Sequence, residues 1–132
     1  MNIEERLLTV NPYSRCGEKQ GTIKNIVVHW VGNAGSTAIA NRNYFENLRN
    51  THTTYASSHY AYHSGSYSMN RKSIGIEDCH PDWGGKFNEN TYNSLVELCA
   101  DICKRYNLNT NAIIRHYDVT GKNCPKYYVE NE

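Results

Sequence analysis

The chain has 132 residues, of which 39% are hydrophobic, enough for one core but not for two domains. Fourteen Lys and Arg against thirteen Asp and Glu give a formal net charge of +1, so no broad basic face for nucleic acid is expected. The longest apolar run, Ile26–Val28, is far too short to span a membrane.

The N-terminal segment Met1–Leu8 carries two acidic residues where a secretory signal would be basic, so we expect synthesis in the cytoplasm without a Sec signal. Five cysteines, an odd number without a C-x-x-C pair, argue against a disulfide framework or a zinc ribbon. We expect one domain over residues 1–132, monomeric by default, with no nucleic-acid or membrane partner.

The first predicted strand, Thr22–Trp30, is rich in β-branched residues and ends in the glycine-containing loop 32–35, which is typical of a central strand. His29 is the next-to-last residue of this predicted strand and therefore lies near the strand end. Ser36 is suited to cap a helix that runs to about Arg49. The apolar residues expected to be buried along that helix are Ile39, Tyr44, Phe45 and Leu48.

Two short strands are predicted next, Ser58–Tyr62 and Ser73–Glu77, separated by a turn through Ser64–Ser66. Alternation along the second strand places its two isoleucines on one face and Glu77 on the other. This strand therefore presents a carboxylate on the face opposite its apolar side chains.

The strongest helical pattern covers Asn90–Tyr106, and a last strand, Ala112–Arg115, delivers His116 into a loop over Tyr117–Pro125. Strands that alternate with helices indicate a single α/β domain with a central mixed β-sheet flanked by α-helices. The helix positions predicted to face the core are Tyr92, Leu95, Val96, Cys99, Ile102, Cys103 and Tyr106.

Two of the predicted strands end at a histidine, His29 and His116, and Cys124 follows eight residues after the second. Two imidazoles and one thiolate suit a catalytic zinc site, which keeps three protein ligands and leaves the fourth position open. Taken one by one, such residues are more typical of a structural histidine or a buried thiol. A metal site is therefore a hypothesis at this level.

Several blocks of this sequence, in the same order, resemble the zinc-dependent N-acetylmuramoyl-L-alanine amidases of the type 2 amidase and peptidoglycan-recognition family. The similarity extends from about Asn11 to Pro125, and its most specific part is the last block. The blocks are Ile26-Val27-Val28-His29-Trp30, Ser58-His59-Tyr60, Ser73-Ile74-Gly75-Ile76-Glu77, Arg115-His116-Tyr117-Asp118-Val119 and Gly121-Lys122-Asn123-Cys124-Pro125.

The resemblance implies hydrolysis of the amide between N-acetylmuramic acid and the first L-alanine of the peptidoglycan stem peptide. It implies that Zn²⁺ is held by His29, His116 and Cys124. It further implies that Glu77 is the general base and that Lys122 stabilises the oxyanion. Without the resemblance, both residues would be interpreted as surface charges.

The resemblance and the chemistry of the loops also suggest a substrate groove. Aromatic faces cover sugar rings and apolar peptide surface, although loop aromatics are more often packing anchors. The candidate substrate-binding residues are Trp30, Asn33, Tyr60 and His63.

The sequence departs from the family in its middle, where only Ala61 separates Tyr60 from Tyr62 and the family carries a hairpin. We expect a shortened hairpin region, an intact metal site, and reduced stability and substrate affinity. The chain also ends soon after the last motif, with no wall-binding repeat.

Taken together, these features predict a zinc hydrolase of endolysin or autolysin type that acts on bacterial peptidoglycan in the cell wall. Two alternatives remain open. One is a peptidoglycan-binding module without catalysis, and the other is a thiol hydrolase with Cys124 as nucleophile and His116 as base.

Overall fold

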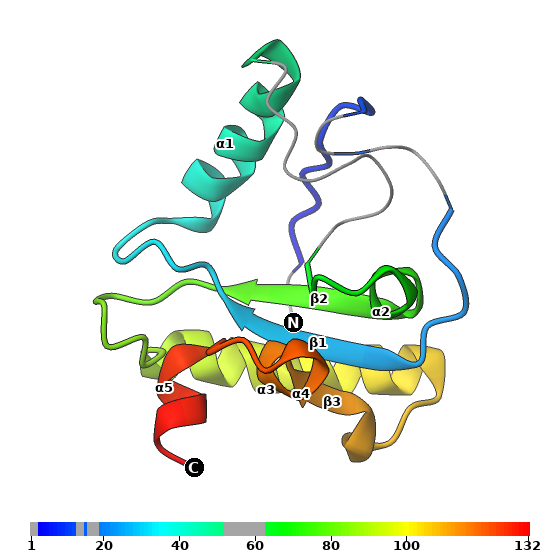
Figure 1. Ribbon diagram of the computed structural model, residues 1–132, viewed down its shortest axis with the longest axis vertical. Helices are drawn as coiled ribbons and strands as arrows, with labels where there is room; N and C mark the ends of the chain where they lie inside the picture. The colour runs from blue at the N-terminus through cyan, green and yellow to red at the C-terminus, as the bar shows by residue number, and fades with distance from the viewer. Residues whose placement is uncertain (1–2, 13–14, 16–18, 52–62) are drawn as a thin grey trace.

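The computed structural model describes residues 3–12, 15, 19–51 and 63–132, and its centre is a parallel β-sheet (Figure 1). The strand order is β2–β1–β3, with β1 over Asn25–Trp30, β2 over Ser73–Asp78 and β3 over Ile113–Arg115. In the register, His29 lies beside Glu77. Because the strands are parallel, their carboxyl ends lie at one edge, where α/β sheets commonly hold ligands.

The predicted α/β architecture, with a central first strand, is therefore confirmed. The described strands pair only in parallel, so within the described part the sheet is not mixed. The predicted strand Ser58–Tyr62 lies outside the described residues, as does the segment around Ala61 where the hairpin region is shortened.

One face of the sheet is covered by the long helix α3 (Glu89–Tyr106), which was predicted to within one residue. Asn88 caps its N-terminus by accepting a hydrogen bond from the Thr91 amide. Among the described residues, no helix has the length and apolar character needed to cross a membrane. The core between sheet and helix contains Ile26, Cys99 and Ile102, surrounded by Ile74, Ile76, Leu95, Leu98, Cys103, Leu108 and Ile113.

Three residues of α3 that were predicted to face the core are exposed instead, namely Tyr92, Val96 and Tyr106. The sheet has only three described strands, so it covers a narrow stripe of the helix. Apolar residues beside that stripe remain in contact with solvent.

Helix α1 (Ala38–Thr51) begins two residues after the predicted cap, and Thr37 rather than Ser36 accepts a hydrogen bond from the Ala40 amide. Figure 1 shows α1 standing away from the layer formed by α3 and the sheet. Only Leu48 of its four predicted core residues is buried. The other three are exposed, which corrects the prediction: Ile39 by 42%, Tyr44 by 51% and Phe45 by 41%.

The structure also contains short helices that the sequence analysis missed: α2 (Tyr67–Lys72), η1 (Thr110–Ala112), α4 (His116–Thr120) and α5 (Lys126–Glu130). The predicted loop Tyr117–Pro125 is thus helical in its first part. Asp118 accepts a hydrogen bond from the Arg115 amide, and Gly121 ends α4 with a φ of 76°. These local caps stabilise a single helical turn that has no apolar periodicity to reveal it.

Candidate metal centre

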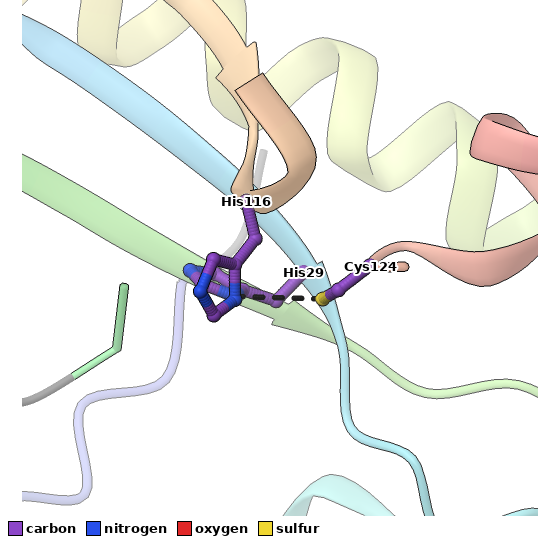
Figure 2. A group of neighbouring side chains, drawn as sticks. All are labelled: His29, His116 and Cys124. Carbon is purple, nitrogen blue, oxygen red and sulfur yellow. Dashed lines mark hydrogen bonds between the residues drawn. The ribbon is translucent and has the colours of Figure 1, made fainter. Parts of the chain in front are cut away.

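Three side chains from separate segments meet at the carboxyl edge of the sheet (Figure 2). His29 is the fifth residue of β1, His116 directly follows β3, and Cys124 lies between α4 and α5. Their donor atoms all lie within 4.8 Å of one another, and all three residues are buried. The arrangement could hold one metal ion, as expected from the two histidines at strand ends and the cysteine that follows the second.

Strand alternation explains the direction of His29, and local contacts place the other two candidate ligands beside it. Ile26 points to the core under α3, so His29, three positions later, points to the opposite face. His116 directly follows β3 as the first residue of α4, and its ring packs against that of His29 with centroids 4.7 Å apart. The amide of Tyr117 donates to the Cys124 carbonyl at 2.9 Å, which holds the cysteine loop against the start of α4.

The electrostatic surroundings keep both imidazoles neutral, which is the form that binds metals. Burial, together with the charges of His63, His116 and Lys122, lowers the pKa of His29 to about 3. Burial and then Lys122 also lower the pKa of His116. The lone pairs of the two rings are thus available to a cation near neutral pH.

The thiol of Cys124 is 2% exposed, and burial raises its pKa to about 11, while a backbone contact with Trp30 opposes this rise. The Sγ atom lies 3.7 Å from Nδ1 of His29. A buried thiol becomes a thiolate when a metal cation binds beside it. Two neutral imidazoles and one such thiol therefore fit the donor set of a catalytic zinc site.

Glu77 lies on β2, with Oε1 3.8 Å from Nδ1 of His29. Its side chain is 47% exposed, so substrate or water can reach it. Burial of its inner side raises the pKa of Glu77 to about 7, and the nearby Lys122 opposes this rise. A carboxyl group with a pKa near neutrality is suited to exchange protons at physiological pH.

Lys122 is exposed on the loop that precedes Cys124. Its positive charge lowers the pKa of His29, His116 and Glu77, so it acts electrostatically on the candidate metal site. The structure thus brings together His29, Glu77, His116, Lys122 and Cys124 from the predicted set.

The four predicted groove residues fall in different surroundings. Trp30 is half-buried, and its ring stacks on His80 with centroids 4.6 Å apart. Asn33 has an exposed side chain, while its carbonyl accepts hydrogen bonds from Ser36. Tyr60 lies outside the described residues.

The fourth groove candidate, His63, contacts His29, one of the three candidate ligands. Its Nδ1 lies 3.0 Å from Nε2 of His29, and its Nε2 lies 3.1 Å from the Ser73 hydroxyl. Burial and the charge of His116 lower the pKa of His63 to about 4, so this ring is also neutral. Both ring nitrogens contact protein atoms, which is unlike a residue that binds substrate.

Sequence reasoning missed the residues that surround the three candidate ligands. Ser73 was predicted only as the first residue of a strand. Alternation places it on the same face as Glu77, and this spacing was visible in the sequence. Ser64 is hydrogen-bonded through its backbone to the His116 ring. Asn70 is buried and belongs to helix α2, which was not predicted, so no sequence pattern indicated that it would be buried near this site.

The family described as N-acetylmuramoyl-L-alanine amidase matches residues 19–127, which include every element of this site. The chain belongs to the N-acetylmuramoyl-L-alanine amidase family. The resemblance proposed from the sequence blocks is therefore confirmed.

Relatives in this family share about a third of their aligned residues with this chain. A probable N-acetylmuramoyl-L-alanine amidase of Bacillus licheniformis is 32% identical over 157 residues, covering 99% of this chain but 44% of the relative. The amidase CwlL of the same organism is 34% identical, with 99% and 44% covered. The chain thus spans less than half the length of these relatives. An aligned length of 157 against 132 residues also requires gaps in this chain, as expected for a shortened region.

Solved structures support the same fold. PlyL matches with a TM-score of 0.77 at 23% identity, covering 98% of this chain and 90% of PlyL. The catalytic domain of PlyG matches with a TM-score of 0.76 at 22% identity, covering 98% of this chain and 87% of that domain. The described part of this chain therefore has the fold of these domains.

Proposed function

We propose that this chain is a zinc-dependent catalytic domain that hydrolyses the amide between N-acetylmuramic acid and L-alanine in peptidoglycan. The observation that carries the proposal is the convergence of His29, His116 and Cys124 at the carboxyl edge of the sheet, in a chain of this family. Bacterial peptidoglycan is then the substrate, and the cell wall is the place of action.

The proposed metal is zinc, because two imidazole nitrogens and one thiolate form a donor set that zinc prefers and that leaves an open position. When bound, zinc makes water a nucleophile near neutral pH and polarises the scissile carbonyl. The burial of all three ligands excludes bulk water from the protein side of the site.

Glu77 is proposed as the general base. It lies on the strand beside His29, is open to solvent, and has a pKa near 7, so it can accept the proton of an attacking water and return it to the alanine amine. Lys122 is proposed to stabilise the oxyanion of the tetrahedral intermediate, since its positive charge acts electrostatically on the same site.

Trp30 and Asn33 remain proposed substrate contacts, together with Tyr60, as walls of a groove whose aromatic faces would cover sugar rings and apolar peptide surface. For His63 we favour a different role, because its two ring nitrogens face His29 and Ser73. The chain 1–132 is proposed to act as one catalytic domain, with the family blocks over 11–125.

The two alternatives find less support. A thiol nucleophile needs to reach a substrate carbonyl, whereas Cys124 is 2% exposed and has a raised pKa. A binding module without catalysis needs neither a complete donor set nor a carboxylate beside it. Both groups are present here.

Chelation separates the three functions. We expect the purified domain to contain one zinc per chain, to solubilise cell walls, to lose this activity with a chelator and to regain it with zinc. His116→Ala should lose both the zinc and the activity. Hydrolysis that survives chelation would indicate a thiol hydrolase, and wall binding without hydrolysis would indicate a binding module.

A further inference from the structure

The His29 ring has two nitrogens with different surroundings. Nδ1 faces the candidate metal site, 3.7 Å from Sγ of Cys124, whereas Nε2 lies 3.0 Å from Nδ1 of His63. A neutral imidazole carries one proton, and only its unprotonated nitrogen can bind a metal. The position of this proton therefore decides whether His29 can act as a ligand at all.

A chain of hydrogen bonds behind His29 has a fixed direction. It begins at the Met69 carbonyl, which can only accept, and Ser73 donates its single hydroxyl proton to this oxygen at 2.6 Å. The Ser73 oxygen must then accept from Nε2 of His63, 3.1 Å away. An imidazole ring that donates from Nε2 can accept at Nδ1, and Nδ1 of His63 lies 3.0 Å from Nε2 of His29, the nitrogen that faces away from the candidate metal site.

The geometry points to His63 and Ser73 as positioning residues that keep the proton of His29 on Nε2 and leave Nδ1 free for the metal. The last bond of the chain runs from Nε2–H of His29 to Nδ1 of His63. This inference rests on the proposed function, since it concerns how the chain prepares the proposed zinc site. Outer partners of this kind set the tautomer and the orientation of metal-binding histidines.

Two features hold His63 in place for this task. Gly75 lies directly against the ring, and a Cβ atom at this position would approach Cγ of His63 to 2.6 Å. Asn70, on α2, accepts hydrogen bonds from the amides of His63 and Ser64 at 3.3 and 3.0 Å and from the Ser64 hydroxyl at 2.6 Å. α2 therefore anchors the segment that supports His29.

The same segment also supports the second histidine. The ring of His116 is hydrogen-bonded to the backbone of Ser64. Residues 63 and 64 thus orient both imidazoles of the candidate site, one through a side chain and one through the backbone.

Zinc affinity tests the role of His63. We would titrate metal-free protein with zinc in competition with a chromophoric chelator. His63→Ala removes the acceptor and should weaken zinc binding by about 10–100-fold. His63→Asn should retain most of the parent affinity, because its amide oxygen is as many bonds from the backbone as Nδ1. Gly75→Ala should weaken binding by displacing the ring, without removing any polar group.

Histidine ¹⁵N NMR of the zinc-loaded parent provides a readout that a merely structural role would not change. The parent spectrum should show zinc on Nδ1 of His29 and a single Nε2–H tautomer for His63. In the variant Ser73→Ala, His63 should be a mixture of its two tautomers. Asn88→Ala, which removes a hydrogen-bonding asparagine at the cap of α3, is the matched control and should leave both readouts unchanged.

If the parent protein binds zinc, two results would overturn this inference and leave the proposed function intact. One is zinc bound to Nε2 of His29. The other is parent-like zinc affinity in both His63→Ala and Gly75→Ala. Failure of the parent to bind zinc would overturn the proposed function as well. A loss of affinity in His63→Ala that His63→Asn does not restore would also contradict the proposed role of the acceptor.

Discussion

At the scale of single residues, Glu77 differs from the three buried candidate ligands because its side chain is 47% exposed, and it lies on β2 beside His29 of β1. We predict that Glu77→Gln lowers the rate of wall hydrolysis by about two to four orders of magnitude, because the amide cannot accept a proton. Zinc content, measured by atomic absorption, should stay at the parent level. Loss of zinc would make Glu77 a ligand, and a parent-like rate would place the base elsewhere.

Asp78, the next residue, points to the opposite face and is buried with its Oδ2 atom lacking a hydrogen-bond partner. Burial, and secondarily the charge of Glu77, raises the pKa of Asp78 from 3.8 to about 7. The folded protein thus holds a proton that the unfolded chain releases above about pH 4. The stability contributed by this proton is lost as the pH rises towards 7.

The variant Asp78→Asn removes this titration. We expect the free energy of unfolding of the variant, minus that of the parent, to rise by about 2–3 kcal/mol when the pH is raised from 5 to 8. Urea unfolding of both proteins at the two pH values, with chelator present, measures the difference. A constant difference between parent and variant would show that Asp78 is ionised in the fold at both pH values.

The sequence blocks predicted His29, His116 and Cys124 as candidate ligands, because each lies at the end of a strand or in a short motif, and the structure brings these three side chains together. The blocks were not sufficient for His63. Its contact with His29 depends on the space at Gly75 and on the path of the chain over α2, neither of which follows from residue spacing.

At the scale of elements, the core between α3 and the sheet is narrow, so each of its apolar side chains matters. Ile102 is 6% exposed and packs in the cluster with Ile26 and Cys99. Ile102→Ala should lower the free energy of unfolding by about 2–5 kcal/mol, measured by urea denaturation. Ser94→Ala, at an exposed position of the same helix, is the control and should change it by less than about 0.5 kcal/mol. Equal effects would contradict the described core.

Helical periodicity made α3 predictable and β-branched residues made β1 predictable, whereas α1 shows where apolar spacing fails to predict burial. The pattern of α1 correctly indicates a helix, but apolar residues are buried only where another element covers them. Among the described elements, none covers Tyr44 and Phe45 fully. α2 and α4 are only six and five residues long, so caps such as Ser66 and Asp118 define them rather than any repeat.

At the scale of the whole molecule, the candidate ligands bring three segments that are far apart in the chain together at one end of the three described strands. We predict that zinc raises the melting temperature, because a ligand at one hundred times its Kd adds about 2.7 kcal/mol to the stability of the native state. Calorimetry with and without a chelator measures this. Identical melting temperatures would contradict a zinc site formed only in the fold.

The central claim concerns which bond the domain cleaves, and one measurement addresses it directly. Purified cell wall is digested with the zinc-loaded domain, and the newly exposed N-terminal residues and reducing ends are quantified. We expect new alanine amino groups, no new reducing ends, and neither product in the presence of a chelator. New reducing ends would identify a glycosidase, and new N-termini other than alanine would identify a peptidase; either result would contradict the proposed amidase.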